Sequence, residues 1–138
     1  VLINRRGLPP IAAAGDLGRT PLIAFANGCS YRKGVEDWRG AANVLPERVL
    51  EFASYPAIVA CVAAGTGVAV VPRSMLAELH SAAAVQANEL PPHLRCNRTH
   101  LVWHPQQESL ALQGLRALLP KLSTNRPGHA AEALAPAA

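Results

Sequence analysis

The stretch "RVLEFASYPAIVACVAAGTGVAVVP" (residues 48–72) decides the fold, because it holds two strand patterns with a helix pattern between them. Residues 48–52 alternate apolar and polar side chains, as a half-buried strand does. Residues 67–71 are a short, continuous apolar run closed by a proline, which is typical of a fully buried strand. Between the two, Pro56 is expected at the first position of a helix and Gly65 at its end.

The same alternation of elements begins upstream of this stretch. Residues 22–25 are a continuous apolar strand pattern, and residues 30–39 form a helix pattern with Ser30 expected as its N-cap and Gly34 as a weak point within it. The order is therefore strand, helix, strand, helix, strand, with short connections and apolar strands. This order predicts an α/β fold with a parallel sheet covered by helices.

Further elements are expected on either side of this unit. They are a buried strand over 1–5, a short helix over 75–80, a strand over 99–104, an amphipathic helix over 109–122 and a polar tail over 123–138. The apolar face of the last helix is expected to point inward and consists of Leu110, Leu115, Leu118 and Leu119.

Composition bounds the function classes. The 138 residues suit one domain or one lobe, and half of them are hydrophobic, which is enough for a core. The net charge is +4, but the basic residues are scattered and aromatics are only 4%, so direct DNA binding by this segment is not expected. The longest apolar run, 57–64, is far too short to span a membrane. The chain begins at Val1 and not at Met, and we expect a truncation upstream.

Two polar segments follow the first two predicted strands, and both open a helix. In parallel sheets of this kind, ligands bind beyond the carboxyl ends of the strands, so these segments are expected to lie side by side. Free N–H groups at a helix start attract anions, and a glycine there allows close approach. The sequence predicts a ligand site formed by Gly28, Cys29, Ser30, Tyr31, Ser54 and Tyr55. The alternative is a pair of capped helices in which Cys29 packs as a small hydrophobe.

The sequence supports a catalytic role for Cys29 less well than it supports a ligand site. A helix N-terminus lowers a thiol pKa, but a nucleophilic cysteine also needs a positioned base. The five histidines form no recognisable signature, so we expect no enzyme and no catalytic residue, with a redox sensor as a weaker possibility still. His100 and His104 lack a third ligand, and the three cysteines lack metal-ligand spacing, so neither a metal nor a cofactor is expected.

The residues quoted below resemble a known family. "PLIAFANGCSYRKGVEDW" (21–38), residues 48–76, "THLVWHP" (99–105) and "ALQGLRALL" (111–119) are similar to the effector-binding domain of LysR-type transcriptional regulators. The resemblance runs from about Asp16 to Leu119. It implies a three-layer, parallel-sheet lobe of a domain like the type 2 periplasmic binding proteins, with ligand in the cleft between two lobes.

The resemblance also implies how the chain divides. Residues 1–122 would be part of the effector-binding domain: a second lobe over about 16–98, crossing strands over 1–5 and 99–104, and a C-terminal helix over 109–122. Most of the first lobe and the N-terminal winged helix-turn-helix that binds DNA would lie outside this chain. DNA would then be contacted only through that absent N-terminal domain.

By the same resemblance, the predicted site residues face the cleft and bind a small polar or anionic effector. The intact protein would be a cytoplasmic homo-oligomer, a dimer or a tetramer, without a membrane partner. The helix over 30–39 and the strand over 48–52 resemble dimer-forming elements, which would make interface residues of Val35, Trp38, Arg39, Val49 and Leu50. A dimerisation or interaction module without a ligand remains the alternative.

Overall fold

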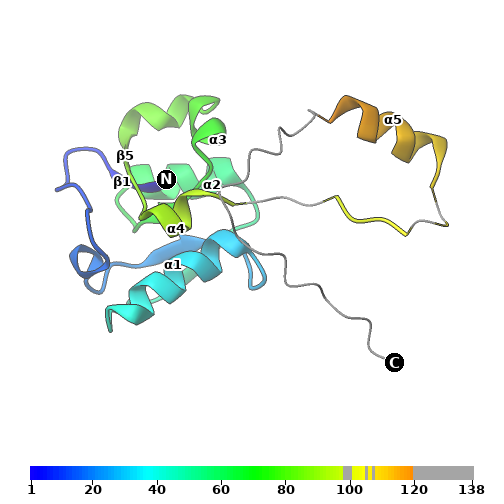
Figure 1. Cartoon of the computed structure of the whole chain (residues 1–138). Coiled ribbons are helices and arrows are strands. Elements are labelled where there is room, and N and C mark those ends of the chain that lie inside the picture. The colour runs from blue at the N-terminus through cyan, green and yellow to red at the C-terminus, as the bar shows by residue number, and fades with distance from the viewer. Residues whose placement is uncertain (98–100, 105, 107, 120–138) are drawn as a thin grey trace. The chain divides into compact units, whose positions relative to one another are not determined.

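The computed structural model describes residues 1–97, 101–104, 106 and 108–119. Two compact units make up the chain, Val1–Thr99 and His100–Ala138. The elements, shown in Figure 1, are β1 (Leu2–Arg5), η1 (Ala14–Leu17), β2 (Leu22–Ala24), α1 (Ser30–Ala41), β3 (Val49–Glu51), α2 (Tyr55–Ala63), β4 (Ala69–Val70), α3 (Arg73–Ala77), η2 (His80–Ala84), β5 (Val85–Asn88), α4 (Pro92–Arg95) and α5 (Leu110–Leu118).

The strands of the first unit form two connected sheets. Strands β2 and β3 pair in parallel, and β1 pairs antiparallel with both β4 and β5 in the order β4-β1-β5. A parallel bridge between Leu22 and Val68 joins the sheets, and the amide of Ile23 donates to the carbonyl of Val68 at 2.8 Å. The predicted parallel arrangement of β2 and β3 is confirmed. Strand β1, within the residues 1–5 that the resemblance gives as a crossing strand, is the middle strand of this unit's antiparallel sheet.

Alternate residues along the strands are buried on opposite faces of the sheet. Leu22 and Ala24 pack in one cluster with Val35 of α1, whereas Ile23 packs in the other with residues of α2. Helices α1 and α2 therefore cover opposite faces of the strands, which gives the three-layer α/β fold (Figure 1). The α2 face is fully buried at Ile58, Val59 and Val62. Burying each such side chain contributes about 1.5–3 kcal/mol.

The helix ends differ slightly from expectation. Helix α2 begins at Tyr55, so Pro56 occupies the second helical position and not the first. Gly65 lies just beyond the C-cap of α2 with φ +86°, a conformation that favours glycine, so the predicted helix end is confirmed. Helix α1 begins at Ser30 and has Cys29 as its N-cap, so the expectation that Ser30 would be the cap is wrong by one residue.

Several elements were not predicted. Strand β5 and helix α4 carry weak sequence signals, because "VQAN" and "PHLR" lack a clear apolar period. The short helix expected over 75–80 lies earlier, at Arg73–Ala77.

The second unit departs further from the prediction. Residues 101–104 adopt no regular structure, so the strand expected over 99–104 is wrong there, and residues 99 and 100 lie outside the described residues. Helix α5 is present, but Leu110 and Leu118 are 85% and 84% exposed. Its predicted inward face is therefore wrong for this unit, where the described residues do not cover it. Residues 120–138, including the expected tail, lie outside the described part of the chain.

Candidate functional site

The start of α1 is a tight turn that follows strand β2. Gly28 has φ +95°, which a side chain would strain, and Cys29 then returns to an extended backbone as the N-cap. The Cys29 side chain makes no capping hydrogen bond. Ser30 and Tyr31 occupy the first two helical positions.

The start of α2 lies beside this turn. The rings of Phe25 and Tyr55 meet edge to face, with centroids 4.9 Å apart and planes at 76°. Burial raises the pKa of the Tyr55 phenol above its ordinary value, and the nearby Tyr31 and Cys29 raise it further. The two strand-end segments are therefore neighbours, as their positions after parallel strands predict.

Ser54 has a local structural role at this position. Its hydroxyl oxygen accepts a hydrogen bond from the amide of Ala57 at 3.4 Å, which caps α2. The residue is exposed. This is the capping role that the sequence left open as the alternative to ligand binding.

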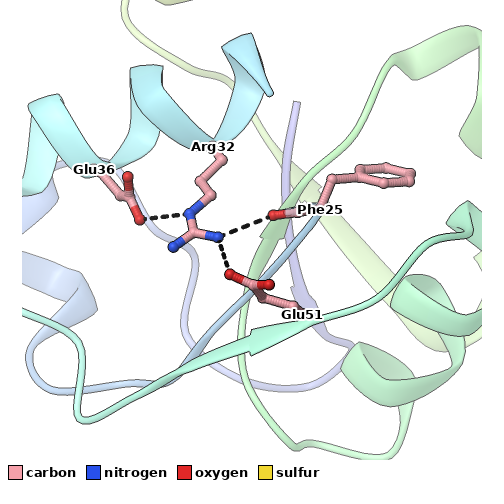
Figure 2. A network of polar contacts seen from close by, with 4 residues as sticks. All are labelled: Phe25, Arg32, Glu36 and Glu51. Atoms are coloured by element: carbon pink, nitrogen blue, oxygen red, sulfur yellow. Dashed lines mark hydrogen bonds and ion pairs between the residues drawn. The ribbon is translucent and has the colours of Figure 1, made fainter. Parts of the chain in front are cut away.

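A polar network fixes the first turn of α1 to the ends of two strands (Figure 2). The Arg32 guanidinium donates to Glu36 at 2.8 Å, to the carbonyl of Phe25 at 3.2 Å and to the Glu51 carboxylate. The hydrogen bonds that Arg32 donates to Glu51 and Glu36 raise the pKa of its guanidinium. Because Phe25 follows β2 and Glu51 ends β3, this network holds α1 at the carboxyl edge of the sheet.

Two adjoining recesses open at this edge. The first, of about 130 Å³, is lined by Ser30 and Tyr31 together with Val70, Leu90 and Asn97. The second, of about 290 Å³, is also lined by Tyr31, Val70, Leu90 and Asn97 and adds charged side chains. Of the six predicted ligand-binding residues, Ser30 and Tyr31 line these recesses, whereas Gly28, Cys29, Ser54 and Tyr55 line neither.

The charged and amide side chains of the recesses were missed by sequence reasoning. Arg73 follows the end of β4, so the strand-end rule applied to a third strand would have found it. Glu89 follows β5, a strand that the sequence did not reveal. Arg95 and Asn97 come from α4 and the residues after it.

The α4 segment lies against the start of α1. The Asn97 amide donates to the Ser30 hydroxyl oxygen at 2.9 Å. A Cβ placed on Gly34 would lie 3.4 Å from the side chain of Leu94, so the glycine sits in contact with α4. Ser30 is thus tied to the recess wall and not to its own helix end.

The predicted interface residues divide into two groups. Val35 and Arg39 are only 2% and 1% exposed, so the lobe itself already covers them. Trp38, Val49 and Leu50 are half-buried and retain exposed surface. Any direct contribution to a partner contact falls to the second group.

Arg39 is a buried cation without a carboxylate partner among the described residues. It donates to the carbonyls of Gly18 at 2.9 Å and Thr20 at 3.0 Å. Its Nε and Nη1 atoms have no hydrogen-bond partner within the part of the chain that is described. Burial lowers the pKa of this guanidinium. The resemblance gave Arg39 as an interface residue, but within this lobe its side chain is already buried.

The described residues contain no group of three or more His, Cys, Asp or Glu side chains arranged to hold a metal ion. Cys29 and Cys61 are half-buried thiols and Cys96 is an exposed one. His93 and Cys96 also line the first recess, and no histidine was expected there from the sequence. In the same described residues, no helix is long and apolar enough to cross a membrane.

The arrangement suits binding of a small polar molecule. Hydroxyl, amide and guanidinium donors converge at the carboxyl edge of the strands, above an apolar wall that includes Val70 and Leu90. Small-molecule sites combine an apolar lining with a few placed polar groups in this way. The fold and this recess define an α/β lobe of the periplasmic-binding-protein type.

The family comparison agrees with this class and makes it specific. The family model described as the LysR substrate binding domain matches residues 4–123, and the chain belongs to this family. It is 34% identical over 104 residues to the HTH-type transcriptional regulator CzcR of Bacillus subtilis (strain 168), covering 75% of this chain and 35% of that protein. It is 34% identical over 77 residues to the HTH-type transcriptional regulator GltR of the same strain, covering 56% of this chain and 26% of GltR.

A solved structure shares the fold. The regulatory domain of CcmR from Synechocystis PCC6803, in complex with 2-PG, matches with a TM-score of 0.53 and 26% sequence identity. The match covers 62% of this chain and 43% of that one. This chain therefore spans only part of its relatives.

Proposed function

We propose that this chain is an effector-binding lobe of a LysR-type bacterial transcriptional regulator and that it binds a small polar or anionic metabolite. Family membership and the HTH-type regulators among its relatives support the regulatory role. The observation that carries the ligand is the recess at the carboxyl edge, with Ser30 and Tyr31 in its wall. The bound 2-PG in the CcmR regulatory domain supports the anionic class.

The proposed mechanism is a shift of conformation without chemistry. The metabolite would lie between this lobe and a second one and would favour one geometry of the two, since a ligand shifts such a balance only through differential affinity. In the intact regulator, that shift would change how DNA-binding domains outside this chain are spaced. No bond is made or broken, so the proposal assigns no catalytic residue, and it places the protein in the cytoplasm.

Within the site, the proposal gives Ser30 and Tyr31 direct roles. Gly28 and Cys29 shape the turn that presents them, and Tyr55 packs behind this turn through Phe25. Ser54, which the sequence placed among the ligand-binding residues, takes the alternative role in this proposal, as the cap that sets the position of α2.

The proposal also includes self-association of the intact protein. Strand β3 is paired on one side by β2 and ends the described parallel sheet, and Trp38, Val49 and Leu50 lie near this edge with exposed surface. We expect sedimentation of the intact protein to show a smaller species for Trp38→Ala than for wild type. An unchanged mass would remove this surface from the interface.

Calorimetric titration of the protein encoded by the intact reading frame tests the ligand. The panel should contain small carboxylates, phosphate esters, amino acids and neutral analogues of the same size. At least one polar or anionic compound is expected to bind wild type and to bind Ser30→Ala and Tyr31→Phe more weakly. Ser54→Ala is the matched hydroxyl control and should bind as wild type does. Absence of binding across the panel would contradict the proposed function.

A further inference from the structure

The second recess contains an ion pair that contributes little to the stability of the fold. The Arg73 guanidinium donates to the Glu89 carboxylate, and their side chains are 62% and 59% exposed. Exposed ion pairs of this kind contribute only about 0–1 kcal/mol to stability. The pair is therefore weak enough for a competing anion to exchange with one partner.

The two residues reach the same edge of the sheet from different strands. Strands β4 and β5 both run antiparallel to β1, which lies between them, so they run parallel to each other. Arg73 follows β4 and Glu89 follows β5, so both lie at the carboxyl edge beside the turn that carries Tyr31. This is the edge at which ligands bind in sheets of this class.

The charges of the recess wall are unbalanced. Arg73 and Arg95 are its basic side chains among the described residues, and Glu89 is its carboxylate. The Nε of Arg95 donates a hydrogen bond to the carbonyl of Leu90 at 2.6 Å. An anionic ligand that enters this recess would therefore meet two guanidinium groups and would compete with the Glu89 carboxylate for Arg73.

We infer that Glu89 occupies the place on Arg73 that the carboxylate or phosphate of an anionic effector takes when it binds. The inference rests on the proposed function and names the ligand class and the residue that holds it. On binding, the ligand anion forms the charge-assisted hydrogen bonds to Arg73, and Glu89 turns to solvent. The short carbon body of the ligand lies against Val70 and Leu90, within a recess of about 290 Å³ that is near the lower bound of small-molecule sites.

Titration calorimetry on the full chain at low ionic strength tests this exchange. Succinate and inorganic phosphate are the probes, and succinamide is the neutral match for succinate. Glu89→Gln removes the competing charge, so succinate or phosphate should bind about three- to tenfold more tightly than to wild type. Arg73→Gln should weaken the same anion at least tenfold, because it loses the charge-assisted contact. Succinamide should show neither change.

Two further variants separate exchange from a general effect of charge. Glu47→Gln removes one negative charge from an exposed residue outside this recess and should leave anion affinity unchanged. The double variant Arg73→Gln with Glu89→Gln should bind like Arg73→Gln alone, since Arg73, the cation that Glu89 holds, is then absent. Equal gains for Glu89→Gln and Glu47→Gln, or a gain that survives in the double variant, would overturn the inference.

The outcome also distinguishes this inference from the function beneath it. If a panel metabolite binds and weakens on Ser30→Ala but ignores both Arg73→Gln and Glu89→Gln, the exchange is wrong and the effector lobe stands. If neither the probes nor any panel compound binds any variant, the exchange and the proposed function are both overturned.

Discussion

The two helix starts at the carboxyl edge look alike in sequence and serve different purposes. Each follows a parallel strand, and each carries a serine beside a tyrosine. Ser54 is an N-cap whose hydroxyl is used by the amide of Ala57. Ser30 stands one position further into its helix, receives a hydrogen bond from Asn97 and lines a recess. A shift of one residue relative to the helix end thus separates a hydroxyl that caps its helix from one that lines a recess.

The same two helices are also anchored differently. Helix α2 is held by an apolar face that is completely buried. Helix α1 buries Val35 and the side chain of Arg39, and the guanidinium of Arg32 ties its first turn to the strand ends. Packing changes are therefore expected to affect α2 most, and loss of the Arg32 hydrogen bonds is expected to affect α1.

The largest expected effect is the loss of packing under α2. Ile58→Ala should lower the free energy of unfolding by about 2–5 kcal/mol, because it removes fully buried methylene groups and leaves a cavity. Leu45→Ala, at a leucine that is 73% exposed, is the control and should change it by less than about 0.5 kcal/mol. Urea unfolding measures both. A loss of less than about 1 kcal/mol for Ile58→Ala would break the contrast.

Arg39 gives the next effect and tests whether volume or charge anchors α1. Arg39→Ala should cost about 2–4 kcal/mol, because it empties a buried site. Arg39→Met keeps most of the volume and removes a buried charge without a carboxylate partner, so stability should stay within about 1 kcal/mol of wild type or rise. If Met destabilises as much as Ala, the hydrogen bonds to Gly18 and Thr20 are the anchor instead.

Arg32 sharpens the comparison at the first turn of α1. Arg32→Met should lower the melting temperature and speed amide exchange at the start of α1, because three acceptors lose their donor. Lys33→Met removes only an exposed pair with Asp37 and should have little effect. Equal losses for the two variants would show that the network in Figure 2 adds nothing beyond surface charge.

The two serines give a smaller and more specific contrast. Ser54→Ala should destabilise the lobe by about 0.5–2 kcal/mol, the usual cost of a lost N-cap. Ser30→Ala should cost less than about 0.5 kcal/mol, because its hydroxyl is at the surface and caps no helix. Thermal unfolding of the pair measures both, and a reversed order would contradict the assignment of roles.

The smallest effect is a pH dependence at Tyr55. Its pKa is raised in the folded state, so the neutral phenol is favoured and its contribution is fully present below the ordinary tyrosine pKa of about 10. That contribution should fade as pH rises through the raised value. Tyr55→Phe should remove this alkaline loss of stability, and an unchanged alkaline profile would argue against a buried phenol.

Much of the first unit could be predicted because its signals are local. Continuous apolar runs bounded by proline and glycine mark β2 and β4, and the proline near the start of α2 marks that helix. The recess could only be predicted in part. Its first wall follows β2, where the strand-end rule was applied, and Arg73 follows β4, where the rule could have been applied. The walls from Glu89, Arg95 and Asn97 follow β5 and α4, which the sequence did not reveal.

The unpredicted parts depend on contacts between distant residues. Strand β5 forms because Leu2 faces Asn88 across the sheet, and the Asn88 side chain donates to Asn4 and accepts from Ile11. Local periodicity carries no trace of such pairing. The prediction for the leucines of α5 has the converse problem. An amphipathic pattern indicates that one face of a helix is suited to burial, but it does not show which residues cover that face.

The most direct test is to map where a ligand touches the lobe. Isotope-labelled chain should be titrated with succinate while backbone amide shifts are followed by NMR. The largest shifts are expected at Ser30, Tyr31, Val70 and Asn97, with little change at Ser54 and Ala57. Shifts centred on the start of α2, or spread evenly over the surface, would contradict the claim that this recess receives the effector.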